Sequence, residues 1–202
     1  MPTPTWRGAD MPRIVAGQLG GRTIPGPPGA GTRPTSDKVR EALFNRLEGW
    51  GALAGARVLD LYAGTGALAF EALSRGAEHA LLVELHGPTA RQLRRTAAEL
   101  GLTDRTEIRS GKAASVSGQL AAQHTADPAV PSADLVFLDP PYDVPTEALE
   151  QMLITLHPAL ADDALIVVER SSRTRPLEWP QGWADDGTKP YGETVLQFGG
   201  PA

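Results

Sequence analysis

The sequence predicts an α/β fold with a doubly wound, mostly parallel sheet and helices on both faces. Two observations support this prediction. From residue 56 onward, apolar runs of strand length alternate with amphipathic segments of helix length. The 202 residues are also enough for one such domain with a sizeable core. The chain has no cysteine, which excludes disulfides and thiolate metal sites and is typical of a reducing compartment such as the cytoplasm.

The N-terminal segment precedes this alternation. Residues 1–11 lack the apolar stretch of a signal peptide and are expected to form a flexible leader. Two short runs around a glycine-rich turn predict a β-hairpin over 13–24. Residues 25–34 are rich in proline and glycine and are expected to form a linker, so that 12–34 make an extension to the main domain, 35–202.

The remaining elements are justified in chain order by capping residues and by hydrophobic periodicity. Thr35 or Ser36 caps a helix that places Val39, Leu43 and Leu47 on one face. Strands are predicted at 57–61, 80–84, 105–109, 134–138 and 164–169, with a last strand within 189–198. Helices are predicted at 67–75, 88–100, 112–123 and 146–156. Residues 125–132 and 171–188 are predicted as loops.

The glycine turn after the first predicted strand indicates a cofactor site. Asp60 lies in this strand, Gly64 and Gly66 follow it, and Glu84 ends the next strand, where a carboxylate can accept hydrogen bonds from ribose hydroxyls. Gly64 to Ala69 also satisfy the dinucleotide fingerprint. A carboxylate at Asp60 would repel a pyrophosphate but suits a cationic amino group, which favours S-adenosylmethionine (SAM) over a dinucleotide.

The tetrapeptide Asp139-Pro140-Pro141-Tyr142 follows the apolar run 134–138. The prolines fix the backbone and remove two N–H donors, so the carbonyls of Asp139 and Pro140 are held rigid. A carboxylate, a rigid carbonyl and an aromatic ring together form a receptor for a flat group that carries an NH2. Asp139, Pro140 and Tyr142 are therefore the candidate catalytic residues, and the alternative is a plain proline-rich turn.

Charge is distributed unevenly along the chain. The net charge is −5, but residues 1–50 carry seven Lys and Arg against four Asp and Glu, which leaves −8 on the remainder. A basic segment on an acidic body is what local contact with phosphate would require. The four histidines lack ligand spacing, so no metal site is expected, and no run approaches the roughly 20 apolar residues of a membrane span.

Several segments, taken together, resemble the RsmD family of class I SAM-dependent methyltransferases. They are Asp60-x-x-x-Gly64-x-Gly66, Glu84, Asp139 to Tyr142, Arg13 to Gly17, Arg33 to Asn45, Glu71 to Ala77 and Tyr191 to Thr194. The resemblance implies a Rossmann-like, seven-stranded sheet whose last strand is antiparallel, with an N-terminal hairpin that helps to hold RNA. It also implies methyl transfer to N2 of a guanine in small-subunit (16S) ribosomal RNA, free or in an assembly particle, by a cytoplasmic monomer.

The resemblance, added to the reading of the residues, completes the predicted site. The cofactor residues are Asp60, Tyr62, Ala63, Gly64, Thr65, Gly66, Glu84, Leu85, Lys112 and Ala113. The candidate RNA contacts are Arg13, Arg22, Arg33, Thr35, Lys38 and Arg40. Lys112 departs from the family pattern, which often has an acid near the adenine, so backbone amides from Gly111 to Ala113 are expected to serve there.

Other functions remain open at this point. The tetrapeptide serves any planar amine, so an adenine-N6 methyltransferase, or one acting on DNA, other RNA or protein glutamine, is an alternative. A nucleotide-binding oxidoreductase is an alternative from another enzyme class, and a noncatalytic RNA-binding module is a third. Arg40 and its neighbours on the first predicted helix are equally consistent with ordinary ion pairs.

Overall fold

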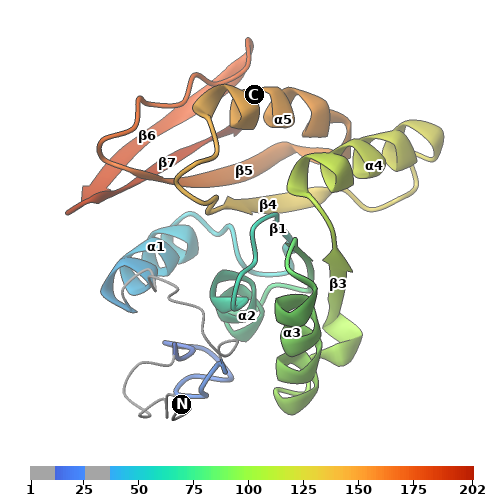
Figure 1. Ribbon diagram of the computed structural model, residues 1–202, viewed down its shortest axis with the longest axis vertical. Coiled ribbons are helices and arrows are strands. Elements are labelled where there is room, and N and C mark those ends of the chain that lie inside the picture. The colour runs from blue at the N-terminus through green and yellow to red at the C-terminus, as the bar shows by residue number, and fades with distance from the viewer. Residues whose placement is uncertain (1–11, 26–36) are drawn as a thin grey trace, which may run out of the picture.

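The computed structural model describes residues 12–25 and 37–202, which form a three-layer α/β fold (Figure 1). A seven-stranded sheet lies between two layers of helices, with α1, α2 and α3 on one face and α4 and α5 on the other. The strand order is β3-β2-β1-β4-β5-β7-β6. Strands β1 to β5 pair in parallel, and β7 is antiparallel to both of its neighbours. The fold predicted from the sequence is confirmed.

The strands and helices lie close to their predicted positions. The strands are β1 (Arg57–Asp60), β2 (His79–Glu84), β3 (Thr106–Ser110), β4 (Ala133–Leu138), β5 (Leu160–Ser171), β6 (Trp183–Tyr191) and β7 (Thr194–Pro201). The α-helices are α1 (Asp37–Gly49), α2 (Ala67–Ser74), α3 (Gly87–Glu99), α4 (Ala113–Ala126) and α5 (Thr146–Leu156). Short 3-10 turns span Thr103–Arg105 and His157–Ala159. None of the helices within the described ranges has the length and apolar character to cross a membrane.

Strand β6 was not predicted: most of it falls in the stretch 171–188 that the sequence indicates as a loop. It is the edge strand of the sheet, and most of its side chains are exposed, so it shows no apolar alternation. Its register shifts between Asp185 and Gly187, and it contains Pro190, which an edge strand tolerates. The strand is fixed by pairing with β7, which a local pattern does not reveal.

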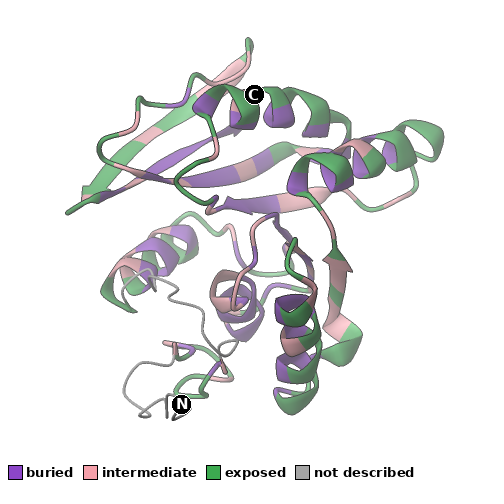
Figure 2. Ribbon diagram, viewed as in Figure 1, coloured by how far each residue is buried: buried purple, intermediate pink, exposed green. Residues whose placement is uncertain are grey.

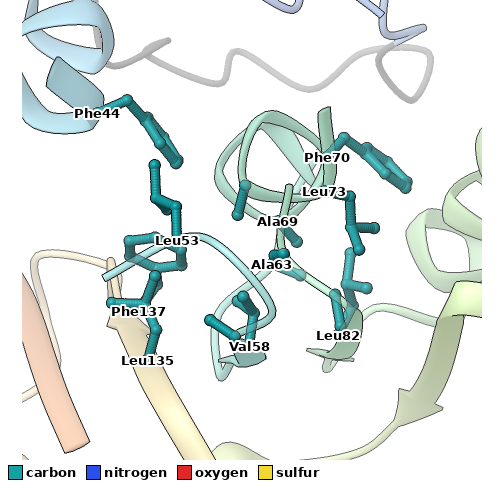
Figure 3. Close-up of a cluster of buried hydrophobic side chains, with 14 of the residues drawn as sticks. Phe44, Leu53, Val58, Ala63, Ala69, Phe70, Leu73, Leu82, Leu135 and Phe137 are labelled. Atoms are coloured by element: carbon teal, nitrogen blue, oxygen red, sulfur yellow. The ribbon is translucent and has the colours of Figure 1, made fainter. Parts of the chain in front are cut away.

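Two apolar cores hold the layers together, one on each face of the sheet (Figure 2). The larger core joins α1 and α2 to the sheet and includes Phe44, Phe70 and Phe137, with the rings of Phe44 and Phe137 5.8 Å apart (Figure 3). The second core lies beneath α4 and α5. Strand residues alternate between the two cores, as a sheet covered on both faces requires.

Residues 12–25, called the hairpin below, pack on the outer side of α2. Arg13 and Thr23 form an antiparallel bridge, and the amide of Ile14 donates to the carbonyl of Arg22 at 2.9 Å. Ile14 and Ile24 are both buried in the larger core. The predicted hairpin is therefore present, although its ladder is shorter than that of two full strands.

Two ion pairs connect helices α1 and α2. Arg40, in the first turn of α1, approaches Glu71 of α2, whereas Arg75, which follows α2, contacts Glu48 near the end of α1. Helix α2 is the next element after β1, so it begins where the parallel strands end. This edge, formed by the C-terminal ends of β1 to β5, is called the carboxyl edge below.

Candidate functional site

The predicted cofactor and catalytic carboxylates meet at the carboxyl edge. Asp60 ends β1, Glu84 ends β2, and Asp139 follows β4. Strand β1 pairs with β2 on one side and with β4 on the other, so these three strands are neighbours. The chain leaves β1 toward β2 and β3 and then returns to β4, so the strand order reverses between β1 and β4. Ligands of open α/β sheets bind at such a reversal.

Glu84 fixes the glycine turn to the end of β2. Its carboxylate accepts hydrogen bonds from the backbone amide of Gly64 at 3.0 Å and from that of His86 at 2.7 Å. Each carboxylate oxygen can accept more than one hydrogen bond. The side chain is half-buried, so it orients the turn and can still accept bonds from hydroxyl groups of a ligand.

Asp60 is a buried carboxylate with unused hydrogen-bonding capacity. It is 1 % exposed, and its Oδ1 atom has no hydrogen-bond partner. Burial raises the pKa of Asp60 to about 7, backbone N–H groups of Tyr62 and Ala69 lower it, and the negative charge of Glu84 raises it. An orphaned carboxylate oxygen in a buried site is costly unless a donor or cation meets it there.

Gly66 is required by the close approach of the turn to α2 and α3. Its φ is +80°, and a Cβ atom at this position would lie 2.5 Å from the ring of Phe70 and 2.8 Å from Leu93. Both contacts are closer than carbon atoms tolerate. The turn therefore lies flat against the start of α2, and Thr65 beside it remains half-buried.

These groups fit SAM. The orphaned oxygen of Asp60 is the kind of acceptor that the ammonium group would need, and Glu84 has acceptor capacity for ribose hydroxyls. Tyr62 is half-buried against the core under α4 and α5, and burial raises its pKa. Ala63 is buried, whereas Leu85 is 66 % exposed beside Glu84. Leu85 offers an apolar contact at the rim of the site.

In the segment after β3, one of the predicted backbone amides is already used within the protein. The amide of Gly111 donates to the carbonyl of Glu84 at 3.1 Å and is thereby occupied. Helix α4 starts at buried Ala113, and the first N–H groups of a helix have no acceptor within it. The side chain of Lys112 is exposed at this N-cap.

The first two residues of the tetrapeptide are packed against the protein, whereas its tyrosine is exposed to solvent. Pro140 is buried, Asp139 is half-buried, and Tyr142 is 67 % exposed. Four large apolar or aromatic side chains of the described residues are exposed, and two of them, Leu85 and Tyr142, lie at the carboxyl edge. Exposed apolar groups beside polar ones are typical of surfaces that contact a ligand.

Arg170 supports the tetrapeptide, and the sequence did not reveal this residue. It lies in β5, is 6 % exposed, and donates from Nη2 to the carbonyl of Val144 at 2.8 Å. The amide of Val144 in turn donates to the carbonyl of Pro141 at 3.1 Å. Burial lowers the pKa of Arg170, and its Nε atom has no hydrogen-bond partner. The only signal in the sequence was its place just after a predicted strand that ends at this edge.

Among the residues that the structure describes, the predicted RNA contacts do not form one cluster. Lys38 is exposed in the first turn of α1. Arg22 instead donates to the carbonyl of Glu99 at the end of α3, which is the opposite end from the carboxyl edge. The side chain of Arg13 is exposed near the start of α1, while Arg33 and Thr35 lie outside the described residues.

Arg40 does not have the exposed position that phosphate contact needs. Its side chain is 1 % exposed, donates to Asp37 at 2.8 Å and also donates to the carbonyl of Arg13. Its Nε lies 3.8 Å from the carboxylate of Glu71. The guanidinium therefore links α1 to α2 and to the hairpin. The prediction that Arg40 contacts RNA is wrong, and the alternative of an ordinary ion pair is the one that the structure supports.

Glu71 is the centre of this link. Its carboxylate is fully buried and accepts hydrogen bonds from the amides of Val15 at 2.6 Å and Ala16 at 3.0 Å, and from Arg75 Nε at 2.8 Å. Beyond it, Gly17 packs so closely on Ser74 that a Cβ atom would lie 2.1 Å from the carbonyl oxygen of Ser74. Glu71 thus fixes the hairpin to α2.

Comparisons with known proteins identify the family of this chain. The family described as "Conserved hypothetical protein 95" matches residues 12–200. The Escherichia coli (strain K12) protein "Ribosomal RNA small subunit methyltransferase D" is 36 % identical over 200 residues, which cover 98 % of this chain and 94 % of that protein. The protein of the same name from Haemophilus influenzae is 36 % identical over 172 residues, or 85 % of this chain and 84 % of its own length.

Solved structures show the same fold. A structure of the Escherichia coli protein yhhF has a TM-score of 0.77 and 30 % identity and covers 95 % of this chain and 98 % of its own. An RNA methyltransferase from Salinibacter ruber, in complex with S-adenosyl-L-homocysteine, has a TM-score of 0.57 and 19 % identity. The match covers 83 % of this chain and 94 % of that protein. The chain therefore belongs to the "Conserved hypothetical protein 95" family, the RsmD family of SAM-dependent methyltransferases.

Proposed function

We propose that this protein transfers a methyl group from SAM to the exocyclic N2 amine of a guanine in 16S ribosomal RNA. The observation that carries the proposal is the position of Asp139 at the carboxyl end of β4, directly beside β1 with the buried Asp60. The names of the relatives, which are small-subunit ribosomal RNA methyltransferases, support the RNA substrate. The choice of guanine N2 as the methyl acceptor rests on the resemblance of the N-terminal half of the chain to the RsmD family.

SAM, when bound, supplies an electrophilic methyl group on a sulfonium. The lone pair of guanine N2 is delocalised into the ring, so the amine must be oriented before it attacks. The Asp139 carboxylate and the Pro140 carbonyl each accept a hydrogen bond from one N–H group of the amine. As the methyl group moves from the sulfur to the nitrogen, a carboxylate oxygen of Asp139 takes the proton that the nitrogen loses. A positioned carboxylate base typically contributes about 10²–10⁴ in rate.

Tyr142 stacks on the base that leaves the RNA helix. The side chain of Tyr142 is 67 % exposed. Stacking of an unpaired base on an aromatic ring is worth about 1–3 kcal/mol. This offsets part of the few kcal/mol that base flipping costs. The hairpin, with the segment up to residue 34, assists in RNA binding, and the protein acts as a cytoplasmic monomer on free 16S RNA or on an assembly particle.

Methylation of 16S RNA, followed by nucleoside analysis of the product, tests the proposed function. Free RNA and small-subunit particles from a strain that lacks this protein should be incubated with the enzyme and labelled SAM. We expect N2-methylguanosine in at least one substrate, and its loss in Asp139→Ala, with SAM affinity nearly unchanged. N6-methyladenosine would instead support the adenine alternative, and activity in Asp139→Ala would refute the mechanism.

A further inference from the structure

Ion pairing divides the positively charged side chains of the described residues into two groups. Most of them have a partner in the protein: a carboxylate, a backbone carbonyl or an aromatic ring. These are Arg22, Arg40, Arg46, Arg57, Arg75, Arg94, Arg105, Arg109, Arg170, Arg173 and Arg175. Within the described ranges, the side chains without such a partner are Arg13, Lys38, Arg91, Arg95, Lys112 and Lys189. Cations of the second kind are available to an external anion.

Two of these cations, Arg91 and Arg95, lie one turn apart on the exposed face of α3. Like charges at this spacing destabilise a helix by about 0.2–0.5 kcal/mol. Arg94 between them differs, because it donates to the carbonyl of Ile108 at 2.8 Å. Glu99 lies one turn beyond Arg95 but forms no ion pair with it in the described part of the chain. The fold therefore gives no structural reason for the two positive charges.

Arg91 points back toward the carboxyl edge. Its Nη1 atom lies 3.7 Å from the position that a Cβ atom of Gly87 would take, at the start of α3. Gly87 is three residues beyond Glu84, the predicted ribose ligand. The first turn of α3 contains no acidic residue, and the positive end of a helix dipole disfavours a cation nearby. An external anion at Arg91 would relieve this repulsion.

The wider charge distribution agrees with an anionic partner on this side of the molecule. Residues 12–25 and 37–112 contain thirteen Lys and Arg against ten Asp and Glu, a net charge of +3. Residues 113–202 contain four against thirteen, a net charge of −9. The boundary thus separates α1 to α3 with the hairpin from α4, α5 and β4 to β7 (Figure 1). Five of the six unpartnered cations belong to the first group.

We propose that Arg91 and Arg95 of α3 form a docking surface for the phosphodiester backbone of the RNA that flanks the target base. This inference rests on the proposed function. The target base must enter at the carboxyl edge, and phosphates of the same strand must pass beside it. Arg91 at the rim and Arg95 one turn away contact these phosphates, with Lys112 at the same edge. Such contacts position the RNA but do not read its sequence.

The double variant Arg91→Gln/Arg95→Gln tests this surface. Binding to a 16S RNA transcript should be measured by fluorescence anisotropy over a salt series. Each lost phosphate contact lowers the slope of log affinity against log salt by about 0.7–0.9, so we expect a decrease of about 1.5 and a roughly tenfold weaker affinity near physiological salt. The melting temperature should stay the same or rise slightly, since a like-charge pair is removed.

Arg173→Gln/Lys189→Gln is the matched control, because it removes two exposed cations from the acidic half. It should leave the slope unchanged. An equal effect of both double variants, or an unchanged slope in Arg91→Gln/Arg95→Gln, overturns the inference. So does a parallel loss of SAM affinity, which would place Arg91 at the cofactor. An effect confined to the assembled particle would mean that the surface contacts a protein and would also refute the inference.

Failure of the docking surface and failure of the proposed function give different results. If the wild-type protein methylates 16S RNA and the α3 variant binds RNA normally, only the docking surface is wrong. If the wild-type protein methylates no ribosomal RNA in either form, the proposed function fails first.

Discussion

At the scale of single residues, Asp60 shows how a buried carboxylate costs stability. Its carboxylate is buried, one oxygen has no partner, and its pKa is raised to about 7 from 3.8. Between about pH 4 and pH 7 the folded protein retains a proton that the unfolded chain has released. The free energy of unfolding therefore falls as pH rises across this window and levels off above it. Active sites commonly carry such a cost.

Asp60→Asn is expected to remove this pH dependence and to stabilise the ligand-free protein at pH 8, because a neutral amide avoids the desolvation penalty of the charge. Urea denaturation at pH 5 and pH 8 measures the effect, with the exposed Asp104→Asn as control. The same variant should bind SAM more weakly, because the partner of the ammonium group is lost. If the free energy of unfolding of Asp60→Asn falls between pH 5 and pH 8 as steeply as that of the wild type, Asp60 is not the source of the pH dependence.

Arg170 is a positioning residue for the tetrapeptide. Arg170→Met removes the hydrogen bond to the Val144 carbonyl but keeps a side chain of similar length. We expect kcat to fall roughly ten- to hundredfold, since small displacements of reacting groups have effects of this size. SAM affinity should change little. Arg173→Met, which removes an exposed arginine just beyond β5, should leave kcat unaltered, and a uniform loss of SAM binding and kcat in Arg170→Met would indicate misfolding instead.

At the scale of elements, α2 has two separate tasks. Its first residues follow the glycine turn, and its last two turns hold the hairpin through Glu71 and Ser74. The motif from Glu71 to Ala77, which contributes to the family resemblance, thus has a structural explanation in this chain. It fixes a segment more than 50 residues away in sequence, since Val15 and Glu71 are 56 residues apart.

Glu71→Gln should release the hairpin. The change leaves Arg40 and Arg75 without their buried counter-charge, and removing one partner of a buried ion pair costs about 3–5 kcal/mol. Amide hydrogen exchange at Val15 and Ala16 should accelerate more than exchange in β1. Glu48→Gln is the matched control, because Glu48 also contacts Arg75 but is 58 % exposed, so its loss should cost no more than about 1 kcal/mol.

At the scale of the whole molecule, one sheet edge collects groups from both layers of the fold. The glycine turn leads into α2 on one face, while Tyr62 and Val144 pack against the core on the other. Binding at this edge should therefore stabilise the complete domain and not a single element. Only SAM, and not a dinucleotide, is expected to do this, because Asp60 would repel a pyrophosphate.

A thermal shift assay measures this stabilisation. SAM at about 100 times its Kd should add about 2.7 kcal/mol to the free energy of unfolding, which corresponds to a rise in Tm of roughly 5–10 °C for a domain of this size. NADH at the same concentration should produce no shift. A shift with NADH and none with SAM would favour the oxidoreductase alternative.

The sequence by itself determined the order of the elements and the nature of the cofactor edge. Apolar periodicity located β1, β2 and β4 to within a few residues because these strands are covered on both faces and need continuous apolar runs. In a parallel sheet the chain order also fixes which strand ends meet. The predicted placement of Asp60, Glu84 and Asp139 at one edge therefore followed from local signals alone.

The tertiary structure decided which charged residues are structural and which remain available. Arg40, Glu71 and Arg170 look like ordinary surface residues in the sequence, but each is buried by segments that are distant along the chain. Edge strand β6 likewise exists through its pairing with β7. Burial and pairing are properties of three-dimensional neighbours, so the sequence pattern around Arg40, Arg91 and Arg95 could not show that only the last two face solvent without a partner.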